Sequence, residues 1–564
     1  MRILPLTLLL LAGAPTNATA VAKEGQSLFM FADLQADAPF VFLPNVDDDS
    51  GRCAGPLAAV VEARTNIGDA ARCHDAADTV VNGPEDAQDL TPLRVAAWPQ
   101  APDDATAIVS VTGNARLMRD GTQFGGTLTA AELRTGIELG VEGLDVARAP
   151  GTGGATFTLT VTAGGETATD TLTGEVAPVL FPSALEPPET LYARRAPTEK
   201  EVRARVAEAE SVWGRLRKQM RSDPATVLER QPSLKRYRDD PSGLKRFAER
   251  EIRRAETGER DWQAFARGYK RTLQKAAPTR DFEGAVFAQD AFETGIAATP
   301  RGSIRVSVLA PGLLDGRLTA VQAAAAAWPF QELRGPGKAV VVGKDYDATG
   351  NFEATPPAPG APLGKLLVGT TRSEGWPAFL AAQAKQPVVR VDTSKLAVGH
   401  VDELVAVIPT KTGWVLAVAD PGQALTLAAG AKVDRHVRRE SKRLVARLDA
   451  LATRLKGELG AEVVRFPVLF GPGDGGLYAA TGNAVNGVAV GNRTFLAADP
   501  HGPRRKGKDV FKAAIATVLE GRGVTLRWVD TMPFPHVRLG EVHCYTNAIR
   551  DPGGLKAWWE VGGA

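Results

Sequence analysis

Three short motifs in the second half of the chain hold side chains that are typical of covalent catalysis. VFAQDAFETG contains Asp290, VGHVDELVAVIP contains His400 and Asp402, and GEVHC contains Cys544. A thiol, an imidazole and a carboxylate can form a nucleophile, a general base and a group that orients the base. Because GHVDE runs into the apolar stretch LVAVIP, we expect a strand there, with His400 and Asp402 projecting to the same side of an extended chain.

The presence of a second carboxylate restricts the class of substrate that would suit such a site. A Cys–His–Asp hydrolase needs only one carboxylate, and a second is costly to bury unless a cation meets it. A guanidinium is planar, permanently charged and able to donate hydrogen bonds in pairs, so it suits two carboxylates. Single His and Asp residues at a strand end are also common structural residues, and the residues alone leave both interpretations open.

The cysteines and the first residues predict an oxidising location. Cys53 and Cys73 lie twenty residues apart, and Cys544 is the third and last cysteine. The chain begins with Arg2, an apolar run and an A-T-A triplet, the pattern of a signal peptide over residues 1–20. Disulfides persist outside the cytosol, so we expect a Cys53–Cys73 disulfide and a secreted, extracytoplasmic protein. Cys544 then remains as a reactive thiol or as an inert buried cysteine.

The remaining chain divides by composition into three parts. Residues 21–190 alternate β-branched and polar residues between glycine-rich turns, which predicts an acidic β-sandwich with 25 Asp and Glu against nine Lys and Arg. A proline-marked linker, ALEPPETLYARRAPT, leads to residues 198–278, where an apolar stripe from Val202 to Met220 predicts helices, broken at later prolines. Residues 279–564 alternate apolar strands with helices, the pattern of an α/β domain.

The helical segment is basic, with 22 Lys and Arg against 12 Asp and Glu over residues 200–280. It is either a solvated insert held by ion pairs along its helices, or a dock for an anionic partner such as nucleic acid or a cell-surface polymer. The acidic residues interleaved with the basic ones disfavour nucleic acid. No later stretch is apolar enough to predict a membrane span, no internal repeat is visible, and nothing indicates the oligomeric state.

Several motifs in order resemble those of the protein-arginine deiminases, members of the guanidino-group-modifying α/β-propeller superfamily. These motifs are QD with a Glu three residues after the Asp, GNFEATPP, PLGKLLVG, VGHVDE, GEVHC.TN and a terminal WW, and FVFLPNVDDDSGRC resembles the start of the family's middle domain. The resemblance implies a multidomain chain. It has an immunoglobulin-like, calcium-binding β-sandwich over residues 21–190, a basic helical insert without a family counterpart over 198–278, and an α/β-propeller (pentein) catalytic domain over 279–564.

The resemblance also implies a role for each catalytic residue. The Cys544 thiolate would attack the guanidinium carbon of an arginine side chain, and Asp290 and Asp402 would hold the guanidinium nitrogens. His400 would act as general acid and base while the covalent adduct forms and is hydrolysed. The products would be citrulline and ammonia.

By the same resemblance, Ca²⁺ is the implied cofactor. Gln289, Glu293 and Glu353 would bind one ion through side chains, with Thr349 and Phe352 contributing backbone carbonyls. A second group would come from the N-terminal module: Asn45, Asp47, Asp49, Asp75, Asp78, Asp86 and Asp89. Carboxylates, amides and carbonyls are the oxygen ligands that Ca²⁺ prefers.

Some positions depart from the family pattern. Ala291, Leu309, Ala310 and Leu313 offer no side-chain oxygen where the family has a further calcium site, so we expect that site to be lost. Gly312 and Leu314 lie near the family's substrate-contacting arginines, whereas Phe287 and Arg538 match positions beside the substrate. The leading hypothesis is calcium-dependent deimination of arginine in proteins or peptides. The alternatives are hydrolysis of free arginine or small guanidines, or a calcium-stabilised surface-binding protein without enzyme activity.

Overall fold

The computed structural model describes residues 33–63, 67–284, 286–310, 320–343, 348–370 and 374–561. The predicted signal peptide, and Gly312, Leu313 and Leu314, lie outside these described residues. Among the described helices, none is long and apolar enough to cross a membrane.

The N-terminal module consists of two five-stranded sheets that enclose one apolar core. One sheet has the order β1 (Leu34–Gln35), β3 (Thr91–Val95), β8 (Ile137–Gly143), β5 (Ala115–Arg119) and β6 (Thr122–Gln123). The other has the order β2 (Val41–Phe42), β10 (Glu166–Val176), β9 (Gly154–Ala163), β4 (Thr106–Gly113) and β7 (Thr127–Leu128). Alternate residues of β9, such as Phe157 and Leu159, are fully buried in this core, as the sequence pattern predicts for a half-buried strand.

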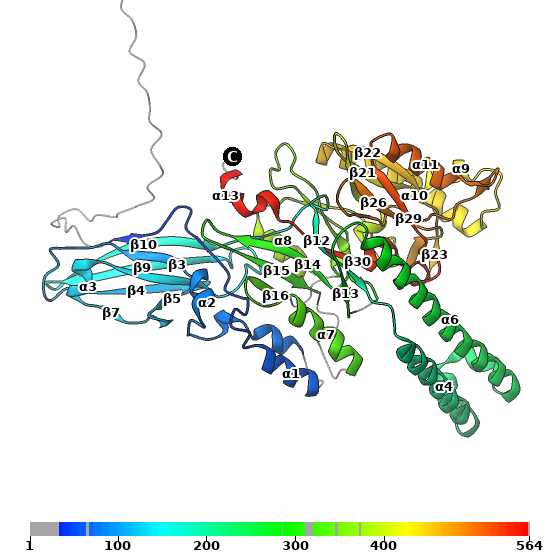
Figure 1. The fold of residues 1–564 in the computed structure, drawn as a ribbon, viewed down its shortest axis with the longest axis horizontal. Coiled ribbons are helices and arrows are strands. Elements are labelled where there is room, and N and C mark those ends of the chain that lie inside the picture. The colour runs from blue at the N-terminus through cyan, green and yellow to red at the C-terminus, as the bar shows by residue number, and fades with distance from the viewer. Residues whose placement is uncertain are drawn as a thin grey trace, which may run out of the picture.

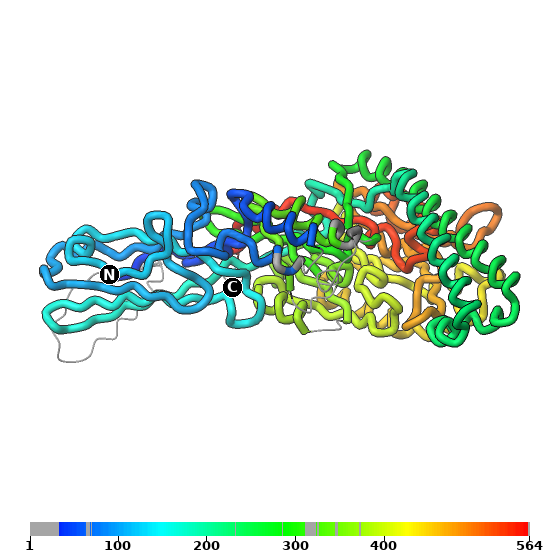
Figure 2. Tube along the Cα trace, turned by 90° about the horizontal axis from the view of Figure 1, so that it is seen from below, coloured from blue at the N-terminus to red at the C-terminus, as the bar shows by residue number. Residues whose placement is uncertain are grey.

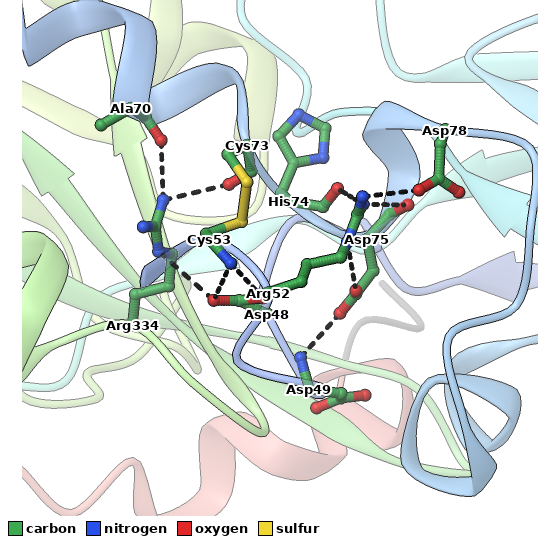
Figure 3. The surroundings of a disulfide bond; sticks show 10 residues. All are labelled: Asp48, Asp49, Arg52, Cys53, Ala70, Cys73, His74, Asp75, Asp78 and Arg334. Atoms are coloured by element: carbon green, nitrogen blue, oxygen red, sulfur yellow. Dashed lines mark hydrogen bonds and ion pairs between the residues drawn. A yellow bond between two sulfur atoms is a disulfide. The ribbon is translucent and has the colours of Figure 1, made fainter. Parts of the chain in front are cut away.

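Short helices connect these strands. They are α1 (Ala54–Ala63), η1 (Ile67–Arg72), η2 (Asp75–Ala77), α2 (Pro84–Asp89) and α3 (Ala130–Thr135). Of these, α2 alone carries three acidic residues, Glu85, Asp86 and Asp89. The predicted disulfide between Cys53 and Cys73 is confirmed, and it closes the loop that holds α1 and η1. Arg334 of the second half donates hydrogen bonds to the carbonyls of Ala70 and Cys73, which fastens this loop to the rest of the molecule (Figure 3).

The second half of the chain repeats one arrangement of strands and helices. In each repeat an antiparallel hairpin is followed by a helical crossover to a third strand parallel to the second. Four repeats follow one another, and the first consists of β14 (Phe292–Ala298), β15 (Ser303–Leu309), α7 (Ala320–Glu332) and β16 (Lys338–Val342). The second consists of β17 (Phe352–Ala354), β18 (Leu366–Val368), α8 (Gly375–Gln383) and β19 (Val388–Arg390). The third consists of β20 (Val405–Thr410), β21 (Gly413–Asp420), α10 (Arg435–Leu459) and β22 (Glu462–Pro467), and the fourth of β25 (Val488–Ala489), β26 (Thr494–Ala498), α11 (Val510–Glu520) and β29 (Thr525–Val529). The α/β pattern is thus confirmed, and the structure contains repeats that are not visible in the sequence.

A fifth repeat joins the two ends of this half. Strand β30 (Thr546–Arg550), near the C-terminus, pairs antiparallel with β12 (Pro188–Arg194), and β12 pairs parallel with β13 (Thr279–Phe282). The stretch expected to be a proline-marked linker therefore contains the strand β12. In addition, β11 (Val179–Leu180) pairs with β14, so residues 179–190 belong with the second half and the β-sandwich ends before the expected residue 190.

The basic helical segment is the crossover of this fifth repeat. It contains α4 (Glu199–Ser222), α5 (Pro224–Arg230), η3 (Pro232–Tyr237) and α6 (Pro241–Leu273), so the predicted helices and their breaks at prolines are confirmed. In Figures 1 and 2, α4 and α6 form a hairpin whose tip points away from the β-sandwich, at the other end of the molecule. The remaining elements are η4 (Thr349–Asn351), η5 (Val401–Glu403), α9 (Pro421–Leu427), β23 (Phe470–Gly473), β24 (Gly476–Ala479), β27 (Arg504–Arg505), β28 (Lys508–Asp509), η6 (His536–Arg538), α12 (Val542–Tyr545), η7 (Gly553–Ala557) and α13 (Trp558–Val561).

Candidate active site

Cys544 lies on the short helix α12, directly before the last strand, and its side chain is only 4% exposed. Asn486, two residues before β25, holds it from one side. The Asn486 amide Nδ2 donates a hydrogen bond to Cys544 Sγ at 3.1 Å, and its Oδ1 accepts one from the Cys544 backbone N at 3.3 Å. The Cys544 carbonyl in turn accepts a hydrogen bond from Gln289 N at 3.2 Å, so the thiol is held by backbone and side-chain contacts from two other repeats.

Asp402 is the carboxylate nearest to this thiol. Its Oδ2 accepts a hydrogen bond from Cys544 Sγ at 3.3 Å and lies 2.9 Å from His543 Nδ1. Its Oδ1 is buried and has no hydrogen-bond partner, which leaves one oxygen free for a cationic ligand. The sequence analysis did not single out His543, which lies beside Cys544 on the short helix α12.

The sequence interpretation of His400 and Asp402 as neighbours on an extended chain is wrong. Residues 401–403 form the 3₁₀ turn η5, in which successive side chains rotate by about a third of a turn, so residues two apart diverge. As a result, Asp402 points to Cys544 and His543, whereas His400 Nδ1 lies 3.5 Å from Asp290 Oδ1. The structure therefore forms two acid–imidazole pairs instead of one.

Asp290 and His400 meet over Gly350 of the turn η4. A Cβ atom at position 350 would stand 2.5 Å from Asp290 Oδ1 and 2.8 Å from His400 Nδ1, so only glycine leaves room for both groups. The Asp290 side chain is 30% exposed and the His400 side chain 12%, which makes this pair more accessible than Asp402. Asp290 Oδ1 has no hydrogen-bond partner.

Burial and charge control the protonation of these groups. Desolvation, followed by the Asp402 and Asp290 carboxylates, raises the pKa of the Cys544 thiol well above its ordinary value. Desolvation also raises the pKa of Asp290 to about 6; the imidazole of His400 lowers it and Asp402 adds to the rise. For His543 burial lowers the pKa, but the hydrogen bond to Asp402 and the nearby Glu353 outweigh it, so the net shift is upward. Without a ligand, the site favours a neutral thiol.

The two residues expected beside the substrate take different places. The Phe287 ring packs on Gly540, four residues before Cys544, where an added Cβ would overlap the ring. The Arg538 guanidinium lies over the Phe534 ring, with 4.0 Å between its Cζ and the ring centroid, and it faces acidic residues of α6. Phe287 thus supports the turn that carries the nucleophile, and Arg538 lies between that turn and the helical hairpin.

Next to the active site, the ligand set expected for one calcium ion converges on a cavity. Gln289, Glu293, Phe352 and Glu353 line it together with His543, and Thr349 Oγ1 donates to the Gln289 carbonyl. Desolvation, followed by repulsion from Glu353, raises the pKa of Glu293 to about 8, and desolvation likewise raises that of Glu353. Two buried carboxylates that repel one another are the donor set that a divalent cation would stabilise.

A second acidic cluster lies on the loops of the β-sandwich. Asp47, Asp49 and Asp75 each offer one carboxylate oxygen within 4.8 Å of the others, and buried oxygens of Asp47 and Asp75 have no hydrogen-bond partner. Desolvation, followed by the charges of Asp89 and Asp49, raises the pKa of Asp47 to about 9. The donor set fits Ca²⁺, and Gly337 N, just before β16, donates to Asp47 Oδ2 at 2.9 Å, which joins this cluster to the second half.

The other expected ligands in this module lie around that cluster. The Asn45 amide donates to Asp86 Oδ1 and to the buried Glu142, which the sequence analysis had not singled out. Desolvation, followed by charges including Asp49, raises the pKa of Asp89 to about 7, so this side chain faces the cluster. Asp78 instead forms an ion pair with Arg52 at 2.5 Å and has a partly exposed side chain (Figure 3).

At the calcium site expected to be lost, the described positions carry no ligand side chains. Leu309 is buried in an apolar cluster, and the Ala310 backbone N donates to the carbonyl of Ala291.

The five parts of the site share one position in the structural repeat. Asp290, Gly350, Asp402, Asn486 and Cys544 each lie two or three residues before the first strand of a repeat. The first strands therefore bring together residues that are far apart in the sequence. This position in the repeat is the signal that identifies Asn486, although it becomes visible only once the repeats are known.

Comparison with known families places the chain in one of them. The family model described as "Protein-arginine deiminase (PAD)" matches residues 266–447 and 433–560, which is more than half of the chain. The chain belongs to the protein-arginine deiminase family. Mouse protein-arginine deiminase type-1 is 28% identical over 316 residues, covering 48% of this chain and 47% of the relative. Rat type-3 is 28% identical over 350 residues (52% and 50%), and human type-4 is 29% identical over 273 residues (40% and 40%). The chain thus spans about half the length of the curated relatives that it matches.

Proposed function

We propose that this protein hydrolyses the guanidinium of arginine residues in proteins or peptides to citrulline and ammonia, through a covalent adduct on Cys544. The observation that supports this proposal most directly is the buried thiol of Cys544, which lies 3.3 Å from Asp402 Oδ2. A second carboxylate, Asp290, is close enough to raise the pKa of the same thiol. Each carboxylate has an oxygen without a hydrogen-bond partner. A planar cation that donates paired hydrogen bonds would satisfy both oxygens at once.

The first half of the reaction forms the adduct. The bound guanidinium brings a positive charge next to the thiol, which lowers the pKa of Cys544 and favours the thiolate, so the thiol proton passes to solvent. The sulfur attacks the guanidinium carbon to give a tetrahedral intermediate, and a protonated His400 gives its proton to the departing nitrogen. Ammonia leaves, and an S-linked amidino adduct remains on Cys544.

The second half releases citrulline. The now neutral His400 accepts one proton from a water molecule that attacks the same carbon. As the carbon–sulfur bond breaks and its electron pair returns to sulfur, the new hydroxyl group loses its remaining proton to solvent and becomes the carbonyl of citrulline. The product ureido group is neutral, so it loses the ion pairs with Asp290 and Asp402 and can leave the site. His543, held by Asp402, keeps that carboxylate oriented through both steps.

We also propose calcium as the cofactor. Its supporting residues are Gln289, Glu293 and Glu353 beside the active site, and the Asp47, Asp49 and Asp75 cluster on the sandwich. When bound, calcium would neutralise these buried carboxylates. The backbone N of Gln289 donates to the Cys544 carbonyl, and Asp290 follows it in sequence, so ordering of Gln289 would order both catalytic groups.

The finer architecture and location are part of this proposal. The two facing sheets support an immunoglobulin-like N-terminal module, and the five repeats support an α/β propeller with the active site at its centre. The Cys53–Cys73 disulfide, together with the signal-peptide pattern of residues 1–20, supports secretion into an oxidising compartment.

The test is citrulline formation by the purified protein, with an arginine peptide and free arginine compared side by side, each with calcium or with a chelator. We expect activity on the peptide with calcium, a strong loss in Asp402→Asn, and no activity in Cys544→Ser. Asp530→Asn is the matched control, because Asp530 forms a His–Asp pair with His501 on the surface. Preference for free arginine would favour a small-guanidine hydrolase. Folded protein that forms no citrulline under any condition would refute the proposal and leave a non-enzymatic binding protein.

A further inference from the structure

The helical hairpin of α4 and α6 packs against the outer side of residues 542–546, the turn that carries Cys544. The second half of α6 contributes Trp262, Phe265, Ala266, Tyr269 and Leu273 to one apolar cluster with β25, β26, β29 and α12. The first half of α6 instead packs around Leu244 in a separate cluster at the tip. The hairpin therefore has two parts: a base that belongs to the core of the catalytic half, and a tip with its own small core.

Trp262 holds the residue that follows the nucleophile. Its indole Nε1 donates a hydrogen bond to the Tyr545 hydroxyl at 2.9 Å, and this hydroxyl donates to the carbonyl of Arg194 in β12, also at 2.9 Å. The Trp262 ring stacks on Phe534 with 5.3 Å between centroids, and both Trp262 and Tyr545 are buried. Tyr545 is thus fixed at its far end by two different elements of the fifth repeat.

Tyr269 contacts Val542 and Thr546, the residues that flank His543, Cys544 and Tyr545 in the sequence. Its hydroxyl donates to the Val542 carbonyl at 3.4 Å and forms a hydrogen bond with the Thr546 hydroxyl, which itself donates to Val542 at 2.9 Å. Val542 and Thr546 lie two residues before and two residues after Cys544. The Tyr269 side chain is 2% exposed, so these contacts are shielded from water.

These contacts complete the support of the thiol. Asn486 and Gln289 hold Cys544 from within the site, and Trp262 and Tyr269 hold residues 542, 545 and 546 from outside. We propose that Trp262 and Tyr269 are positioning residues, through which the helical hairpin determines where the Cys544 sulfur stands relative to Asp402. Their effect on turnover rests on the deiminase function proposed above, whereas their effect on the thiol does not.

The test uses Trp262→Phe and Tyr269→Phe. Tyr269→Phe keeps the ring and removes only the hydroxyl, whereas Trp262→Phe keeps an aromatic side chain but replaces the indole, with its N–H, by a smaller ring. Cys544 is the free cysteine of the chain, so iodoacetamide reports on this thiol alone in the disulfide-intact protein. Loosening the turn should expose a thiol that is now buried, and we expect its alkylation rate to rise by about threefold or more. A displaced sulfur should lower kcat for an arginine peptide by roughly tenfold, with KM within about threefold of the wild-type value.

Two variants at the tip control for loss of stability. Leu244→Ala removes a buried side chain from the tip cluster, and Trp213→Phe replaces a ring that packs edge-on against Phe247 at 5.5 Å. Leu244→Ala should lower the melting temperature by more than Trp262→Phe does, yet leave alkylation and kcat unchanged.

The proposal is overturned if Trp262→Phe and Tyr269→Phe change the melting temperature alone, or if Leu244→Ala reproduces their effects on the thiol. If the wild-type protein forms no citrulline, the proposed function fails, and the alkylation rates still decide whether the hairpin positions the thiol.

Discussion

Gly350→Ala is the most direct perturbation of the Asp290–His400 pair. The Ala side chain would add one methyl group between Asp290 and His400, and the three atoms nearest to it would all belong to these two residues. Since the backbone of Gly350 does not adopt the left-handed conformation, the substitution acts through this steric contact and not through backbone strain.

The size of the effect follows from the geometry. The added Cβ would stand 2.5 Å from Asp290 Oδ1 and 2.8 Å from His400 Nδ1, whereas ordinary contacts begin at 3.4 Å. The carboxylate would therefore have to move by about 0.9 Å and the imidazole by about 0.6 Å. Displacement of a reacting group by about 1 Å can cost roughly 100-fold in rate, so we expect kcat/KM for an arginine peptide to fall by about that factor.

The assay is citrulline formation over a range of peptide concentrations, together with circular dichroism and thermal unfolding. Gly214→Ala is the control, because a Cβ at this position of α4 meets no atom within 4 Å and Ala favours the helix by about 1 kcal/mol. The control should keep full activity and an equal or higher melting temperature. If Gly350→Ala retained activity within about twofold of the wild type while folded, the Asp290–His400 pair could not be the acid–base and substrate-binding pair that we infer.

Three further predictions concern protonation, calcium and the disulfide. The pKa of the Cys544 thiol is raised by burial and by Asp402 and Asp290, so alkylation of the substrate-free protein should keep accelerating with pH through pH 9. Asp402→Asn removes one negative charge beside the thiol and should shift the pH profile of alkylation to lower pH. An unchanged profile would contradict the conclusion that Asp402 raises the pKa of Cys544. Calcium at about 100 times its dissociation constant should stabilise the protein by about 2.7 kcal/mol in thermal unfolding. Asp47→Asn should reduce this gain, whereas Asp78→Asn, which breaks an ion pair with Arg52, should leave most of it; the opposite ranking would place the ion elsewhere. Reduction of the disulfide should lower the free energy of unfolding by about 3 kcal/mol without abolishing turnover, and equal denaturant midpoints with and without reductant would refute this.

Much of the local structure is visible in the sequence. The stripe from Val202 to Met220 predicts a helix, and α4 covers it, beginning with the capping box that Thr198 and Glu201 form. The alternation in residues 154–163 predicts β9, because one face of that strand is buried and the other is not. Short-range periodicity is informative wherever one side of an element faces the core.

The tertiary arrangement of the site is less accessible to the same reasoning. The η5 turn replaces the expected strand start, because His400 and Gly399 backbone N–H groups bond to the Glu403 carboxylate and close a tight turn. The partnership of Asp402 with His543 depends on how two repeats meet, which periodicity within either one does not specify. The fifth repeat escapes notice for another reason: its strands come from residues 188–194, 279–282 and 546–550, separated by the helical hairpin and by most of the chain.

The equivalence of the five repeats explains why so long an insert is compatible with the site. Each repeat places its functional residues before its first strand and its helical crossover after its second, so the crossovers are separate from the catalytic groups. In four repeats the described part of the crossover contains one or two helices, of which α10 with 25 residues is the longest, whereas in the fifth it extends into the hairpin of α4 and α6 (Figure 1). The tip of this hairpin can vary without reaching the site, because its core is separate from that of the base. The base of the hairpin cannot vary in this way. In the fifth repeat Cys544 lies just before the first strand, and α6 forms hydrogen bonds directly with the turn that carries Cys544. The helical hairpin is thus bound, at its base, to the turn that carries the residue on which the proposed chemistry depends.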